Sequence, residues 1–117
     1  MGNFQNLYAW QKSKNLAVEV YKLCQHTKLS KDFGLRDQIQ RSVVSVPSNI
    51  AEGDELGSDK QSVKHFLIAK GSLAELITQI IISNEIGYID NSKKENIINE
   101  CKTISVMLSR LIKARTS

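Results

Sequence analysis

Turn-forming residues are scarce in this sequence of 117 residues, which contains one proline and six glycines. With so few residues that interrupt regular structure, the elements between the turns must be long, and this favours helices. Hydrophobic residues make up 41% of the chain and charged residues 24%, proportions typical of globular and not of disordered proteins. The length is enough for one hydrophobic core and too short for two, so we expect a single domain over residues 1–117.

Long hydrophobic runs are missing as well. Runs such as the three isoleucines at residues 80–82 are far shorter than the roughly 20 residues that span a bilayer. No apolar stretch follows the first charges near the N-terminus, so no secretory signal is expected, and Asn6 breaks the myristoylation pattern. We therefore expect a cytoplasmic protein with no membrane contact. Cys24 and Cys101 would be reduced there and would serve as small core residues.

Sequence patterns for catalysis, metal binding and phosphate loops are also absent. Di-iron bundles need Glu-x-x-His pairs, but the residue three positions before His26 is leucine, and three before His65 it is serine. Neither cysteine has a histidine at helical spacing on its own face, and no glycine-rich phosphate-binding motif occurs. We expect no catalytic residue, no metal ligand and no cofactor, and therefore a protein that is not an enzyme.

Apolar periodicity is the strongest positive signal. Apolar residues recur at three- and four-residue steps in four segments, at about residues 6–27, 35–56, 58–85 and 90–117, which is the pattern of helices with one apolar face. Short connections make consecutive helices antiparallel neighbours. We therefore predict an all-α protein, an antiparallel up-down-up-down four-helix bundle. In chain order, the predicted core faces hold Leu7, Trp10, Ala17, Val20, Tyr21 and Cys24; Leu35, Ile39, Val43, Val46 and Ile50; Val63, Phe66, Leu67, Leu73, Ala74, Ile77 and Ile81; and Ile97, Cys101, Ile104, Leu108 and Leu111.

The predicted helices carry recognisable end signals. Ser58 and Ser92 each precede a Gln or Glu by three residues, the capping-box spacing at a helix start, and Gly87 marks the end of the third helix. Pro47 lies inside the second helix, where it removes one backbone hydrogen bond. We expect a kink there rather than a helix end.

Polar residues also occur where burial is expected. A second stripe on the second helix holds Gln38, Arg41, Ser42, Ser45, Asn49 and Glu52. If the second and third helices pair around a turn near residue 57, Arg41 lies level with Glu75. Lys70 then falls in the middle of the third helix's apolar face, next to Gly71 and Ser72, which would allow close helix approach. These residues form either a polar network inside one bundle or a contact between subunits, and both interpretations stay open.

The net charge of +4 is unevenly distributed, with +3 on residues 5–29, −2 on residues 30–57 and +3 on residues 90–117. Asp54, Glu55 and Asp59 crowd the turn between the second and third helices, where solvated ion pairs with the basic end of the fourth helix are favoured over a weak cation site. No run of aromatic residues alternates with the basic ones along the terminal helices, so sequence-specific reading of a single strand is not expected. Candidate phosphate contacts are Lys12, Lys14, Lys22, Lys102, Arg110, Lys113 and Arg115.

The run FGLRDQIQRSVVSVPSNIAEG, followed by FLIAKGSLAEL, resembles the 23S rRNA intervening-sequence protein family of bacterial four-helix bundle proteins. The resemblance extends from LYAWQKSKNLAVEVYKL through NEIGYI. It implies an up-down bundle that commonly forms a ring-like homopentamer without an established enzymatic role. Relatives in diversity-generating retroelements bind nucleic acid and a reverse transcriptase through a basic surface. The matching signature positions, which the resemblance implies to be structural or interfacial, are Arg41, Ser45, Pro47, Asn49, Glu52, Gly53, Lys70, Gly71 and Glu75.

One departure from the family pattern concerns the residues after the A-E-G motif, where relatives often carry basic residues and this chain has Asp54, Glu55 and Asp59. Phosphate binding is therefore not expected at that end. We expect a non-enzymatic homo-oligomer, a pentamer by resemblance, that scaffolds RNA, DNA or a partner protein such as a reverse transcriptase. The alternative is a structural or protein-recruiting module without affinity for nucleic acid.

Overall fold

Four long helices account for most of the chain in the computed structural model, which describes residues 3–116. They are α1 (Tyr8–His26), α2 (Phe33–Glu55), α3 (Asp59–Glu85) and α4 (Asn91–Thr116). Two short 3-10 turns, η1 (Phe4–Asn6) and η2 (Lys28–Lys31), precede α1 and α2. No strand occurs within residues 3–116. The predicted all-α class with four helices is confirmed.

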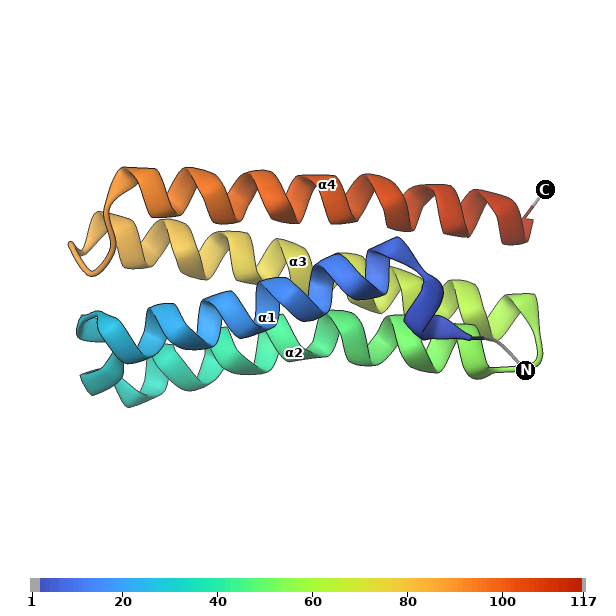
Figure 1. Ribbon diagram of the computed structural model, residues 1–117, viewed down its shortest axis with the longest axis horizontal. Helices are drawn as coiled ribbons and strands as arrows, with labels where there is room; N and C mark the ends of the chain where they lie inside the picture. Colours follow the sequence, from blue (N-terminus) through green and yellow to red (C-terminus); the bar gives the residue numbers. More distant parts are fainter. Residues whose placement is uncertain (1–2, 117) are drawn as a thin grey trace.

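The helices run up and down along one long axis, in a molecule of 44 × 20 × 20 Å (Figure 1). Each helix packs on its neighbour in the chain, and α1 also contacts α4, which closes the bundle. The α2–α3 turn lies at the same end as the start of α1 and the end of α4 (Figure 1). The opposite end is formed by η2 and the α3–α4 turn. The predicted antiparallel four-helix bundle is confirmed.

Side-chain caps and one glycine fix the helix ends. Asp32 caps α2 and Ser58 caps α3, in each case through a side-chain oxygen that accepts a backbone N–H. Gly87 has a φ of +85° and ends α3 as predicted, because glycine adopts this left-handed conformation without steric cost. The predicted cap at Ser92 is wrong. Asp90 caps α4 instead, accepting from the Lys93 amide at 2.8 Å, because it directly precedes the first helical residue.

The predicted core faces of α2 and α4 are confirmed. Each of these two helices contributes four residues to the core that are at most 2% exposed: Ile39, Val43, Val46, Ile50, Ile97, Cys101, Ile104 and Leu108. Leu35 and Leu111 are partly buried and pack against this core. These two helices have polar residues on their outer sides, so the spacing of their apolar residues identified one face without ambiguity.

The predicted core face of α3 is partly wrong, as is one residue of α1. Leu67 is 54% exposed, Ile81 is 38% exposed, Ala74 is exposed, and Tyr21 of α1 is 39% exposed. The buried side of α3 holds Ser62, Phe66, Ala69, Ser72, Leu73, Leu76, Gln79, Ile80 and Ser83. Since α3 is apolar around most of its circumference, three- and four-residue spacing fits more than one face.

The apolar character of α3 also makes it long and hydrophobic enough to cross a membrane by length and composition alone, with a mean hydropathy of 1.5 over 18 residues. In the bundle, 44% of that window is buried, against α2 on one side and α4 on the other. Core helices of globular proteins meet the same criterion, so this property does not by itself indicate a membrane protein.

Pro47 lies inside α2 and does not end it, as predicted, and its ring is buried. Nearby, Asn49 Nδ2 donates to the Ser45 carbonyl at 2.8 Å, one turn earlier on the same helix. The side chain thus adds a hydrogen bond to the backbone close to the position where proline removes one.

Candidate interaction surfaces

The signature residues of α2 form a polar seam with α3 inside one bundle. Ser45 Oγ and Ser72 Oγ lie 2.8 Å apart, and Asn49 Nδ2 donates to Ser45 Oγ at 3.0 Å. Since the Asn49 amide nitrogen is the donor there, its Oδ1 accepts from His65 Nδ1 at 3.0 Å. Glu52 Oε2 lies 3.3 Å from the same histidine nitrogen. We call this network of Ser45, Asn49, Glu52, His65 and Ser72 the α2–α3 polar seam.

Gly53 ends the signature motif at a position where α2 is in close contact with α3. A Cβ at this position would lie 2.7 Å from Phe66 Cε1 and 3.1 Å from the Ser62 carbonyl oxygen, so only glycine fits without displacement. The Gly53 carbonyl accepts from Ser62 Oγ at 2.6 Å, which fixes the two backbones against each other. The glycine of the motif therefore has a structural role in the protomer.

Ion pairing between the α2–α3 turn and the end of α4 is confirmed for one pair. Arg115 Nη2 lies 3.3 Å from Asp54 Oδ1, and its guanidinium also lies over the Phe66 ring at 5.5 Å from the centroid. The Asp54 side chain is only 8% exposed, so this pair is largely buried rather than solvated as predicted. Arg115 therefore takes part in the packing of this end of the bundle.

Lys70 and Gly71 behave differently from their buried neighbour Ser72. Lys70 is partly exposed, and its Nζ donates to Ser109 Oγ of α4 at 2.5 Å, so the ammonium reaches the bundle edge. Gly71 is exposed, and a methyl group added to it would meet no heavy atom within 4 Å, so the prediction that it lets α2 approach is wrong. Successive residues on a helix are about 100° apart, and Ser72 points to α2 instead.

Among the described residues no ion pair joins Arg41 to Glu75, both of which are exposed.

The side of α3 that faces away from the bundle is apolar and exposed. Large exposed fractions occur at Leu67 (54%), Ile68 (42%), Ile81 (38%) and Ile82 (44%). The exposed residues between them are mostly small or uncharged. We define the outer α3 face as Leu67, Ile68, Gly71, Ala74, Glu75, Thr78, Ile81 and Ile82.

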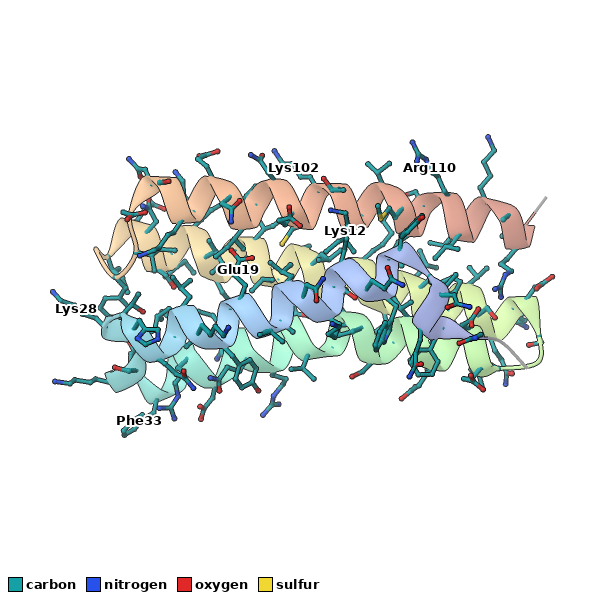
Figure 2. All side chains as sticks on the ribbon, viewed as in Figure 1. Lys12, Glu19, Lys28, Phe33, Lys102 and Arg110 are labelled. Atoms are coloured by element: carbon teal, nitrogen blue, oxygen red, sulfur yellow. The ribbon has the colours of Figure 1, made fainter. Side chains whose placement is uncertain are left out.

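The seven candidate phosphate contacts are not gathered into one patch. Lys12 Nζ lies 3.9 Å from Glu100 Oε2 between α1 and α4, and Lys14 donates to Asn15 and lies 6.0 Å from the Trp10 ring centroid. Lys102 and Arg110 point away from the outer side of α4, whereas Lys12 lies between the two helices (Figure 2). Five candidates are exposed and form none of the ion pairs found in residues 3–116: Lys14, Lys22, Lys102, Arg110 and Lys113. Of these, Lys14 donates a hydrogen bond to its neighbour Asn15.

A further cluster at the opposite end of the bundle was missed from sequence. A depression of about 510 Å³ lies where η2, the start of α2 and the α3–α4 turn meet, and we call it the bundle-end depression. It is lined by Lys28, Lys31, Asp32, Phe33 and Tyr88. The run KLSKDF was the available signal, but Tyr88 comes from 56 residues further along the chain. Only the fold brings these residues together.

Burial raises the pKa of the Cys24 thiol and raises that of Cys101 to about 12, so both thiols are protonated at neutral pH. Both are buried core residues, as predicted. Within residues 3–116 no group of three or more His, Cys, Asp and Glu side chains could hold a metal ion.

Comparison with known proteins agrees with this architecture. The family model described as 23S rRNA-intervening sequence protein matches residues 5–110. The crystal structure of a protein of unknown function from the S23 ribosomal protein family of Bacteroides thetaiotaomicron is similar, with a TM-score of 0.82 and 27% sequence identity. The similarity covers 90% of this chain and 98% of that chain. No curated protein matches the sequence.

Proposed function

This chain belongs to the 23S rRNA-intervening sequence protein family, and from that premise we propose that it is a non-enzymatic subunit that assembles with copies of itself and scaffolds nucleic acid or a protein that acts on it. The bundle has a complete core and a polar seam that is satisfied internally. What the protomer leaves uncovered are the outer α3 face and the exposed basic residues of α1 and α4. These two surfaces carry the two parts of the proposal.

The observation that carries self-association is the exposure of the outer α3 face. Four large aliphatic side chains on this face are between 38% and 54% exposed. Exposed aliphatic side chains that recur along one side of a helix favour a contact site. Glu75 is the one exposed charged residue between Leu67 and Ile82. A neighbouring copy that covers the face therefore has to supply a partner for this carboxylate.

Gly71 adds support for a helix as the covering element. Glycine in a helix interior costs about 0.5–1 kcal/mol relative to alanine, and no contact inside the protomer explains it. Together with Ala74 one turn away, it leaves a shallow place where a second backbone can approach closely. We propose that α3 of another copy lies there, and the family resemblance makes five the expected number of copies.

The mass of the assembly tests this part directly. Sedimentation equilibrium at micromolar concentration should give a multiple of the 13.1 kDa chain mass, with five copies expected. A species of 13.1 kDa under these conditions would reject self-association and leave the outer α3 face unexplained.

Nucleic-acid binding is the second part, supported by the exposed Lys22, Lys102, Arg110 and Lys113. A ring repeats these residues, and multivalent contact strengthens a surface that is weak in one protomer. Gel retardation of mixed RNA and DNA should show binding at low salt that weakens steeply as salt rises. The rival function, a structural or protein-recruiting module, is favoured by the ion pairs that Lys12 and Arg115 form with other helices of the bundle. It stands if the assembly retards neither nucleic acid.

A further inference from the structure

The bundle-end depression is not used by the core or by the outer α3 face. We propose that it binds an unpaired nucleotide within a single strand of RNA or DNA, with the base stacked on the Phe33 ring and the flanking phosphates beside Lys28 and Lys31. The proposal deepens the nucleic-acid part of the proposed function and rests on it. It adds a site distinct from the basic residues of α1 and α4, at the end of the bundle where Lys28 and Phe33 project (Figure 2).

Phe33 provides a rigid stacking platform. Its side chain is 64% exposed although it is the first residue of α2, where a polar residue would be the ordinary choice for a solvent-facing position. The Arg36 guanidinium lies 4.7 Å from the ring centroid. Arg36 is itself held by the Ser30 carbonyl at 3.1 Å and by Asp37 Oδ1 at 3.2 Å. The guanidinium thus supports the Phe33 ring on one side. Because the ring is exposed, it still offers apolar surface on which a base can stack.

The floor of the depression is fixed by a hydrogen-bonded pair from opposite parts of the chain. Tyr88 Oη donates to Asp32 Oδ2 at 3.0 Å, while Asp32 Oδ1 accepts from the Leu35 amide at 3.2 Å. The hydrogen bond to Asp32, together with burial, raises the pKa of Tyr88, so the tyrosine stays protonated and the link persists. The depression is shallow and open to solvent, with a volume of about 510 Å³, so a nucleotide bound there would stay part of a longer strand that continues past the protein surface.

The two lysines supply the contacts for phosphates. Lys28 and Lys31 are both exposed, and neither takes part in the ion pairs of the described residues. Asp32 is the only carboxylate in the lining, and both of its oxygens already accept hydrogen bonds. An exposed aromatic ring with cations beside it is the combination by which proteins hold single strands. A duplex cannot use the platform, because its bases are stacked inside the helix.

Fluorescence anisotropy with labelled single-stranded RNA and DNA of about 12 nucleotides, each compared with its duplex, tests the site. Phe33→Ala should weaken single-strand binding about tenfold, the loss expected from one base–aromatic stack, with little effect on the duplex. Phe33→Trp should restore single-strand affinity because it keeps a flat aromatic surface. Leu56→Ala is the control, since Leu56 is 36% exposed at the acidic other end of the bundle and should leave affinity unchanged.

The lysines give an independent readout. Lys28→Gln and Lys31→Gln should each flatten the dependence of log affinity on log salt by about 0.7, the value for one phosphate contact on a single strand. Circular dichroism checks that each variant keeps its helical content. The site is rejected if Phe33→Ala leaves single-strand affinity within about twofold of wild type, or weakens single strand and duplex alike.

The outcomes separate this site from the proposed function. If Phe33→Ala has no effect while loss of Lys102, Arg110 and Lys113 weakens binding, the bundle-end site fails and the proposed basic surface stands. If wild-type protein binds neither probe at low salt, the site and the nucleic-acid part of the proposed function both fail. Sedimentation equilibrium, which tests self-association through the outer α3 face, does not depend on either result.

Discussion

Gly53 of α2 and Phe66 of α3 are in such close contact that a Cβ on Gly53 would lie 2.7 Å from Phe66 Cε1. Phe66 is completely buried, so its ring cannot move aside into solvent. The signature glycine thus sets the distance between α2 and α3 at the end of the bundle where Arg115 also packs on Phe66.

Gly53→Ala should therefore destabilise the protein by about 1–3 kcal/mol, the usual cost of overpacking a well-filled core. The measurement is urea or thermal unfolding followed by circular dichroism. Gly34→Ala is the control in the same helix, because no atom lies within 4 Å of its added methyl group. It should be neutral or slightly stabilising. Equal stability of the two variants would contradict the close contact.

Leu108→Asp should unfold the domain. Leu108 is 0% exposed in the core face of α4, and a carboxylate there has no partner. The cost is comparable to the total stability of about 5–15 kcal/mol for a small domain. Val106→Asp makes the same chemical change on the outer side of the same helix, at a residue that is 52% exposed, and should keep helical circular dichroism. A folded Leu108→Asp variant with an unchanged melting temperature would show that the α4 core face is misassigned.

Leu67→Lys should weaken self-association without unfolding the protomer. Leu67 is 54% exposed on the outer α3 face, and a lysine there would be buried without a partner in a contact between copies. Sedimentation should show a lower average mass, with helical circular dichroism unchanged. Val106→Lys, at a similarly exposed position on α4, should leave the mass unaltered. If both variants behave alike, α3 is not the contact.

Replacing Lys102, Arg110 and Lys113 with Gln should weaken RNA and DNA binding together. All three are exposed on α4, so their contacts with phosphates would carry no sequence information. The slope of log affinity against log salt should become flatter by about one unit for each lysine or arginine that no longer meets a phosphate. Substitution of Arg115 is unsuitable here because it would break the pair with Asp54. An effect on one sequence or one type of nucleic acid alone would argue against electrostatic binding.

Cys101 should be unreactive in the folded protein. Burial raises the pKa of its thiol to about 12 from a usual value of 9.0, so iodoacetamide at about pH 8 should modify it only after unfolding. Between pH 9 and about pH 12, the folded state keeps the thiol proton that the unfolded state loses. The stability from this group is therefore fully present below about pH 9 and is lost as pH rises towards 12. Between about pH 8 and about pH 10.5, the urea midpoint should fall less steeply for Cys101→Ala than for wild type.

The sequence by itself determined the four helices, their order and the buried faces of α2 and α4. In these two helices polar and apolar residues separate cleanly around the circumference, so periodicity leaves one solution. End signals were also sufficient where the capping chemistry is local, as at Ser58 and Gly87. The family signature could also be recognised from the sequence. The sequence did not show whether the signature residues make their contacts within one protomer or between protomers.

Only the tertiary structure decided which side of α3 is buried, because its apolar residues extend around most of the helix and α2 and α4 select the packed side. It also placed Arg115 against Asp54 and Lys70 against Ser109, contacts that depend on how distant helices align. The hydrogen bond between Tyr88 and Asp32, which are 56 residues apart in the sequence, likewise depends on the tertiary structure. Local spacing fixes the face of a helix on which a side chain lies, whereas packing of the whole bundle fixes what that face meets.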